Sequence, residues 1–142
     1  MITIEIVSQL TTQVDEVGEL IKRAYDITVA GPMPDLSNKK LEHIIEIEKI
    51  KYLIGLTELP KFHILAKDGV KIIGFGIISE SSLQFFYDLT WVCVDPAYRK
   101  QGIGKQITVE ATKFAKSRDR NIIITTEVPK FYTELGFTIA GN

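Results

Sequence analysis

The chain has 142 residues, of which 45% are hydrophobic and 25% charged, and its formal net charge is −1. This length suits one domain, over residues 1–142, with a sizeable core. The near-zero charge indicates neither a nucleic acid nor an anionic membrane as a partner. No apolar run approaches the roughly 20 residues of a membrane span, and residues 1–5 lack the pattern of a signal peptide. The single cysteine, Cys93, excludes an internal disulfide and a cysteine-based zinc site. We therefore expect a cytoplasmic protein without a metal ion.

Hydrophobic periodicity and the breakers between periodic segments predict ten elements. In chain order they are a strand at 2–7, a helix that starts at 12–15 and ends before Ala30, a helix at 37–52, strands at 62–66, 70–79 and 84–94, a helix at 102–116, a strand at 121–126, a helix at 129–135 and a strand at 137–140.

The connections between these elements predict how the strands pair. Asp68-Gly69 is a hairpin turn, so the strands on either side of it pair antiparallel. The strand at 121–126 follows a helix, so it is expected to lie parallel to the strand at 84–94. Gly136 ends the helix before it as a C′ glycine. The fold class is therefore α/β (α+β), with a mostly antiparallel mixed sheet, a parallel pair in its middle and helices on both faces.

The strand at 84–94 is expected to present different residues on its two faces, because side chains alternate along a strand. One face is largely apolar and carries Phe85, Tyr87, Leu89, Trp91 and Cys93. The other carries Gln84, Phe86, Asp88, Thr90, Val92 and Val94. Cys93 is thus expected in the core. Two interpretations of Asp88 and Thr90 stay open: they face a ligand, or they lie on a solvated surface.

The most informative segment runs from Arg99 to Gly104, between that strand and the next helix. A helix N-terminus leaves backbone N–H groups unused and attracts an anion. Gly102 and Gly104 allow a ligand to approach this backbone closely. A dinucleotide fingerprint would need glycine or alanine in place of Ile107, and a P-loop would need a hydroxyl residue in place of Gln106. Two interpretations of this segment remain. It binds a pyrophosphate without a metal ion, or it is a turn that only lets the strand and the helix pack.

Two motifs in this chain resemble those of one family. Arg99-x-x-Gly102-x-Gly104, after Val-x-Pro, resembles the acetyl-CoA-binding motif of the GNAT superfamily of N-acetyltransferases. The segment 131–137, Phe-Tyr-Thr-Glu-Leu-Gly-Phe, resembles the same family's second motif. The order of elements is similar to the family's over essentially the whole chain. The resemblance implies a GNAT-like fold. Relatives usually continue past the last strand, whereas five residues follow Phe137 here, so this strand is expected to be truncated. The end of the sheet is then missing, dispensable or supplied by a partner chain, and an exposed edge favours a homodimer.

The resemblance also implies a cosubstrate, acetyl-CoA, and residues that hold it. The pyrophosphate is expected at the turn and the first helical residues, which are Arg99, Lys100, Gln101, Gly102, Ile103, Gly104 and Lys105. The pantetheine arm is expected along the backbone of Val92, Cys93 and Val94. The N–H of Val92 would polarise the acetyl carbonyl. Tyr132 matches the tyrosine that protonates the leaving thiolate.

The acceptor implied by the resemblance is a primary amine of a small molecule or a peptide. Its attack needs a proton acceptor, because amines are mostly protonated at neutral pH. Asp88 occupies a position where some relatives carry a glutamate base, and Glu80, Glu127 or a water molecule are alternatives. A CoA- or acyl-CoA-binding sensor or interaction module without catalysis is the alternative function.

Overall fold

The computed structural model describes residues 1–10, 13–28, 61–125 and 129–138. The helix predicted at 37–52 and the candidate base Glu127 lie outside these residues.

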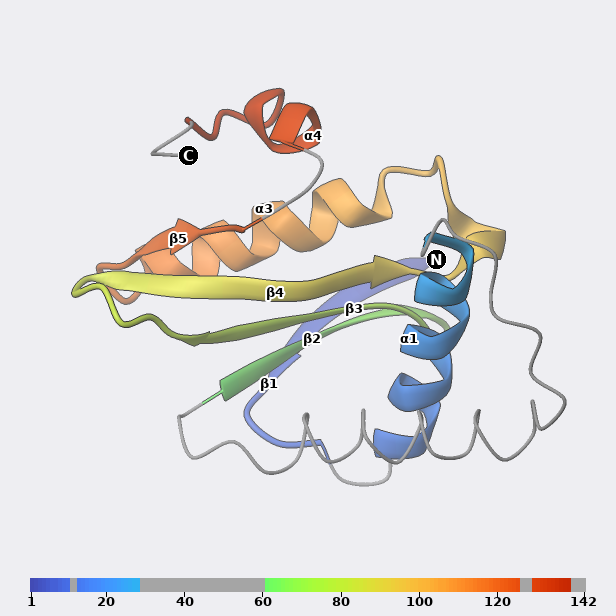
Figure 1. Ribbon diagram of the computed structural model, residues 1–142. Coiled ribbons are helices and arrows are strands. Elements are labelled where there is room, and N and C mark those ends of the chain that lie inside the picture. Colours follow the sequence, from blue (N-terminus) through green and yellow to red (C-terminus); the bar gives the residue numbers. More distant parts are fainter. Residues whose placement is uncertain (11–12, 29–60, 126–128, 139–142) are drawn as a thin grey trace, which may run out of the picture.

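The described chain forms a five-stranded sheet with helices on both sides (Figure 1). Its elements are β1 (Ile2–Val7), α1 (Val14–Thr28), β2 (Lys61–Asp68), β3 (Lys71–Glu80), β4 (Phe86–Val94), the 3-10 turn η1 (Pro96–Tyr98), α3 (Ile103–Lys116), β5 (Asn121–Ile123) and α4 (Pro129–Thr133). The strands lie in the order β1-β2-β3-β4-β5. The first four pair antiparallel, and β4 pairs with β5 in parallel. The predicted mixed sheet is confirmed.

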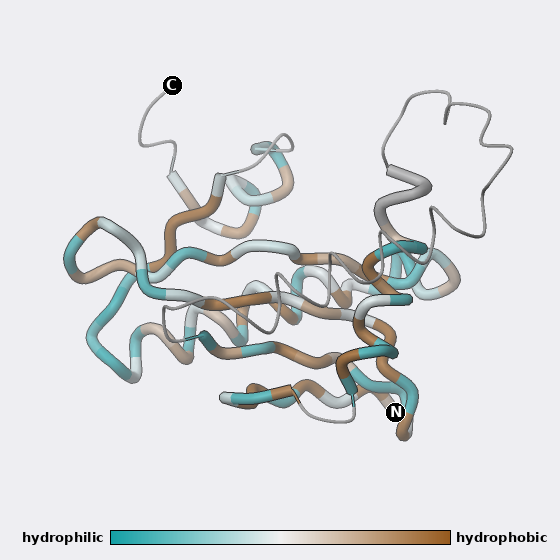
Figure 2. The backbone as a smooth tube through the Cα atoms, turned by 60° about the horizontal axis from the view of Figure 1, so that its bottom comes forward, coloured by the Kyte–Doolittle hydropathy of each residue, from teal (hydrophilic) through white to brown (hydrophobic). Residues whose placement is uncertain are grey.

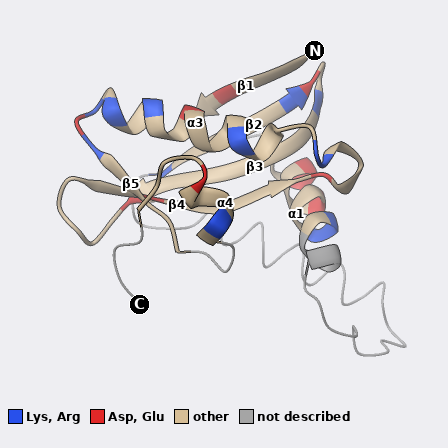
Figure 3. Ribbon diagram, turned by 90° about the horizontal axis from the view of Figure 1, so that it is seen from above, with Lys and Arg blue, Asp and Glu red and all other residues tan. Residues whose placement is uncertain are grey.

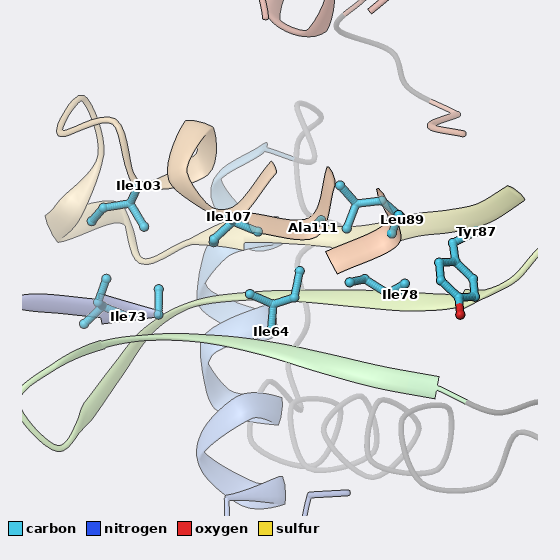
Figure 4. Packing of buried hydrophobic residues seen from close by; sticks show 10 residues of the cluster. Ile64, Ile73, Ile78, Tyr87, Leu89, Ile103, Ile107 and Ala111 are labelled. Carbon is cyan, nitrogen blue, oxygen red and sulfur yellow. The ribbon is translucent and has the colours of Figure 1, made fainter. Parts of the chain in front are cut away.

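Two apolar clusters cover the two faces of the sheet. One joins α1 to β2 and β3 through Leu20, Leu65 and Phe75. The other joins α3 to the sheet, and Figure 4 shows Ile103, Ile107 and Ala111 among residues of β2, β3 and β4. Neighbouring residues of one strand enter different clusters, because their side chains alternate between the faces. Hydropathy follows this plan in the two central strands, β2 and β3, whose middles are hydrophobic and whose ends are hydrophilic (Figure 2).

A β-bulge in β4 overturns part of the predicted face assignment. Thr90 pairs with Ile77 and Cys93 with Phe75, so Trp91 and Val92 both stand opposite Gly76. Trp91 takes up the extra residue in a left-handed conformation, with φ of 57°. One extra residue reverses the alternation that follows it.

The prediction that Leu89 and Cys93 share a face is therefore wrong. Leu89 packs in the cluster under α3, whereas Cys93 packs in the cluster under α1. Val92 and Val94 contact the α3 cluster as well. Asp88 and Thr90 alternate with Leu89, so the predicted grouping of Asp88 with Val92 on one face is also wrong.

The C-terminal elements are shorter than predicted. β5 ends at Ile123 rather than at 126. Gly136 has φ of 100° and closes α4, as the sequence predicted. The N–H of Phe137 donates to the Tyr132 carbonyl at 3.1 Å, so the backbone at Phe137 completes the end of the helix and does not begin a strand. The rest of the predicted final strand lies outside the described residues.

Within the ranges that the structure describes, no helix is long and apolar enough to cross a membrane.

Candidate functional site

The turn after β4 is organised by a buried carboxylate. Asp95 is only 6% exposed, and its own N–H donates to the Ile73 carbonyl at 2.8 Å. Its side chain accepts from the N–H of Ala97 at 3.0 Å and so caps η1. Burial opposes ionisation of Asp95, but the Ala97 N–H and the Arg23 guanidinium outweigh it, so the pKa of this carboxyl lies below its ordinary value. Asp95 is therefore a charged anchor at the base of the turn.

Side-chain bonds tie this turn to two other elements. Arg23 of α1 lies 3.0 Å from the Asp95 carboxylate. Arg99 donates from Nη2 to the carbonyl of Ala24, also on α1, at 3.0 Å. Tyr98 donates to Asp68 at the β2–β3 hairpin at 2.8 Å. The side chain that the sequence motif associates with pyrophosphate, Arg99, is thus engaged on α1.

The first turn of α3 begins with an unusual backbone. Lys100 and Gly102 both have left-handed conformations, with φ of 64° and 76°. Gly102 is the N-cap and has no side chain to cap the helix. The first backbone bond of α3 joins the Gln106 N–H to the Gly102 carbonyl at 3.0 Å. The N–H groups of the intervening residues, 103–105, therefore have no acceptor within the helix, and this is the geometry that binds anions.

Gly104 lies where three distant parts of the chain meet. A Cβ atom built at Gly104 would lie 3.6 Å from Phe131 of α4 and 3.9 Å from Val94 at the end of β4. The two sequence motifs are thus neighbours in space. Both separations are ordinary van der Waals contacts, so the packing of the protein itself does not require glycine here.

A groove of about 550 Å³ runs along the flank of α3 that faces β1. Its lining residues are Ile4, Gly102, Lys105, Gln106, Val109 and Glu110. Two of them, Gly102 and Lys105, belong to the predicted pyrophosphate turn. Lysine and arginine residues also follow α3 toward its C-terminal end (Figure 3).

On the other side of α3, β4 continues past the end of β5. The parallel pairing covers Phe86, Tyr87 and Asp88 alone, whereas β4 runs on to Val94 (Figure 1). Beyond Asp88, the ranges that the structure describes contain no strand paired with this edge of β4. The edge leads toward Val94 and Gly104, where α4 crosses.

Tyr132 is partly buried in an aromatic group at this end of the molecule. Its ring lies edge-on to Phe131 and to Phe137, with centroid separations of 4.9 and 6.0 Å. Burial raises the pKa of its hydroxyl above the ordinary value of about 10. Tyr132 therefore keeps its proton at neutral pH and can act as a donor.

The candidate bases differ in their surroundings. Asp88 is partly buried and lies opposite Ser79 in the β3–β4 register. Because of the bulge at Trp91, Asp88 and Val92 are separated by three steps of the β3 register, about 10 Å at the usual rise of a strand. Glu80 pairs with Tyr87, at the other end of β4 from Val94, and it forms an ion pair with Arg120 at 3.2 Å. Neither carboxylate adjoins Val92.

Cys93 is buried, and burial raises the pKa of its thiol to about 12. A thiol in this state is not a nucleophile at neutral pH, as expected for a core residue. Among the described residues, no group of three or more His, Cys, Asp or Glu side chains could hold a metal ion.

Three residues of the site, Arg23, Asp95 and Phe131, were not predicted from the sequence. Asp95 carries a local signal, because aspartate before proline often caps a turn. Phe131 stands inside the second motif but was not singled out. Nothing local marks Arg23, whose contact with Asp95 spans 72 positions of the chain.

Comparisons with known proteins show what the sequence and the fold of this chain resemble. A family model described as an acetyltransferase (GNAT) domain matches residues 60–139. A GNAT-family acetyltransferase structure from Desulfovibrio desulfuricans superposes with a TM-score of 0.73 at 14% identity, over 99% of this chain and 87% of that one. ElaA from Escherichia coli gives 0.70 at 16% identity, over 100% and 90% of the two chains.

A GNAT-family acetyltransferase from Brucella melitensis, solved in complex with acetyl-CoA, gives a TM-score of 0.66 at 18% identity, over 96% and 84%. No curated protein sequence matches the chain. At these identities the solved structures establish the fold alone, while the family model covers more than half of the chain.

Proposed function

Because the chain belongs to the GNAT acetyltransferase family and is an acyltransferase, we propose that it transfers an acetyl group directly from acetyl-CoA to a primary amine, as a single domain over residues 1–142. The observation that carries the proposal is the proximity of the two motifs: a Cβ atom built on Gly104, in the first motif, would lie 3.6 Å from the ring of Phe131, in the second. It brings the Tyr132 helix to the start of α3 and to the end of β4.

The proposed cosubstrate lies across two parts of the site. Its pyrophosphate binds at the N-terminus of α3, where residues 103–105 present backbone N–H groups. Its pantetheine arm runs beside Val92, Cys93 and Val94, where β4 extends past β5. The Brucella neighbour with bound acetyl-CoA supports this choice of ligand.

The proposed reaction forms one bond and breaks one. The amine nitrogen attacks the acetyl carbonyl carbon, placed at the backbone of Val92, and the carbon–sulfur bond then breaks. Tyr132 donates its proton to the leaving thiolate. A phenol whose pKa is raised by burial is fully protonated at neutral pH and so is ready to donate.

The attacking nitrogen must also lose a proton. We assign this proton to Asp88 acting through a chain of water molecules, because three steps of the β3 register, about 10 Å, separate Asp88 from Val92. The same separation favours one alternative, a protein that binds CoA or acyl-CoA without catalysis. Glu127 remains a further candidate base.

A thiol-release assay with acetyl-CoA and a panel of amines tests the proposal. The panel contains a polyamine, an aminoglycoside, an amino acid, a peptide N-terminus and a lysine side chain. We expect release with at least one of them. Binding of CoA in calorimetry without release for any amine would favour the non-catalytic alternative, and an absence of CoA binding would exclude both.

The role of Tyr132 is tested with Tyr132→Phe. We expect kcat to fall by about 100-fold, with the affinity for CoA little changed. Glu134→Gln, an exposed position just after the same helix, serves as the control and should retain wild-type kcat. Wild-type turnover by Tyr132→Phe with every accepted amine would remove Tyr132 from the mechanism.

A further inference from the structure

Helix α1 is bonded to the turn before α3 at two consecutive residues. Arg23 lies 3.0 Å from the Asp95 carboxylate, and the carbonyl of Ala24 accepts from Arg99 at 3.0 Å. We call these two contacts the α1 strap. The strap joins a helix that contains neither sequence motif to the segment predicted to bind pyrophosphate.

The Arg23–Asp95 contact differs from an ordinary surface ion pair. The Asp95 side chain is 8% exposed and that of Arg23 is 44% exposed. Exposed pairs contribute little, but removing one partner of a buried carboxylate leaves that charge without compensation. Asp95 also holds the Ala97 N–H, so a shift of its carboxylate would be transmitted to the backbone of η1.

The turn beyond η1 needs such support. Lys100 and Gly102 both have positive φ, and Lys100 pays a steric penalty for it because it carries a Cβ atom. Strained conformations persist only where the surrounding structure fixes both ends of the segment. Here α3 fixes one end, and Asp95 with the α1 strap fixes the other.

We propose that Arg23 and Asp95 are positioning residues for the cosubstrate, and that Arg99 acts with them through Ala24 rather than by touching pyrophosphate. The inference rests on the proposed function. The strap holds the turn that precedes the free backbone N–H groups of 103–105, so that binding does not have to order this turn. Preorganisation of this kind increases affinity by reducing the entropy lost on binding.

The proposal predicts different effects on a ligand that contains the pyrophosphate and on one that lacks it. Coenzyme A contains the pyrophosphate, whereas S-acetylpantetheine lacks it and would contact the strand alone. Loss of the strap should therefore weaken the binding of CoA and leave the binding of S-acetylpantetheine unchanged. A general loosening of the fold would weaken both.

The experiment measures dissociation constants by calorimetry for the wild type, Arg23→Gln, Asp95→Asn and the double variant. We expect each single change to raise the Kd for CoA by about five- to tenfold. The Kd of the double variant should not exceed the higher of the two single-variant values, because both changes remove the same ion pair. The KM for acetyl-CoA should rise in parallel, with kcat at saturation retained. Arg23→Lys should restore part of the affinity. Lys116→Gln, an exposed change of the same charge on α3, is the control.

Arg99 is tested in the same series. If it acts only through the strap, Arg99→Gln raises the Kd for CoA no more than Arg23→Gln does, because each change removes one of the two contacts. A loss of affinity about tenfold larger for Arg99→Gln than for Arg23→Gln would identify Arg99 as a direct pyrophosphate ligand and overturn this part of the proposal.

The outcomes separate this inference from the proposed function. A wild-type protein that fails to bind CoA contradicts the proposed function. A wild type that binds CoA, with Arg23→Gln and Asp95→Asn binding equally well, contradicts the strap alone. Equal losses for CoA and S-acetylpantetheine would also contradict it. Should Asp95→Asn fail to fold, the comparison of Arg23→Gln with Arg23→Lys decides the question.

Discussion

Two Gly-x-Gly segments border α3, and they differ in what the missing side chains allow. On β3, a Cβ atom at Gly74 would lie 3.0 Å from both Ala66 Cβ and Ile107 Cδ1, and one at Gly76 would lie 3.3 Å from Ile107 Cγ2. At the start of α3, a Cβ atom at Gly102 would have no neighbour within 4 Å, and one at Gly104 none closer than 3.6 Å.

The difference in free space distinguishes glycines that serve packing from glycines that are proposed to serve binding. The β3 glycines let α3 lie close on the sheet, so the protein itself fills the space that they leave. The α3 glycines leave space that the protein does not fill. The same pattern of residues thus serves packing where the N-terminal half of α3 lies on β3, and it leaves room for the proposed ligand at the first turn of the same helix. Four predictions test this division.

The largest effect on stability is expected at Gly74. In Gly74→Ala the new methyl group meets Ala66 Cβ, which cannot rotate away. We expect a loss of about 1–3 kcal/mol in the free energy of unfolding, as for other overpacked cores, with CoA affinity of the folded protein nearly unchanged. Urea unfolding and calorimetry measure the two quantities. A variant as stable as the wild type would show that α3 can lift from the sheet at little cost.

The same substitution at Gly104 should have the opposite consequences. Gly104→Ala adds a methyl group in ordinary contact with Phe131 and replaces a poor helix former. We expect unchanged or slightly higher stability, and an affinity for CoA lower by about tenfold, equivalent to about 1.4 kcal/mol. If CoA affinity stayed at the wild-type level, the pyrophosphate would not approach the backbone at this position.

A smaller effect is expected at Gly102, where the backbone conformation rather than space is the constraint. Gly102→Ala places a side chain at φ of 76°, which costs about 1 kcal/mol. Gly69→Ala is a matched control, since Gly69 has φ of 64° and no neighbour within 4 Å of a Cβ atom. We expect similar losses of stability in both, but weaker CoA binding in Gly102→Ala alone. Equal CoA affinities in the two variants would contradict a ligand role for the α3 turn.

The smallest expected effect is the change with pH in the stability lost on replacing Asp95. The pKa of Asp95 is lowered in the folded protein, so its contribution to stability is present above the unfolded value of about 3.9 and is lost as the pH falls through the folded value. Asp95→Asn should therefore have a lower free energy of unfolding than the wild type at pH 7. This difference between the two proteins, which we call the gap, should become smaller below pH 4. The apolar Gly74 contact does not titrate, so the gap for Gly74→Ala should stay constant. Urea unfolding at pH 7, 5, 4 and 3 gives both gaps, and a constant gap for Asp95→Asn would show that its charge contributes nothing.

Much of the fold was predictable because its signals are local. The alternation of Ile2, Ile4 and Ile6, the Asp68-Gly69 turn and the C′ glycine at 136 each depend on a few neighbouring residues, and the structure contains the elements they predict. The faces of β4 were mispredicted for the same reason. No local signal marks the bulge, since tryptophan rarely adopts a positive φ and does so here opposite Gly76 of another strand.

By itself the sequence determined the order of the elements β1, α1 and β2 to α4, the mixed sheet, and the two motifs that point to an acetyltransferase. These depend on propensity, periodicity and spacing, which act between residues close in the chain. Only the tertiary structure decided that Phe131 lies beside Gly104, that Cys93 faces α1, and that Arg99 and Asp95 are bonded to α1. Such contacts join residues up to 75 positions apart. They depend on how α1 and α3 pack on opposite faces of one sheet, and no local pattern contains that information.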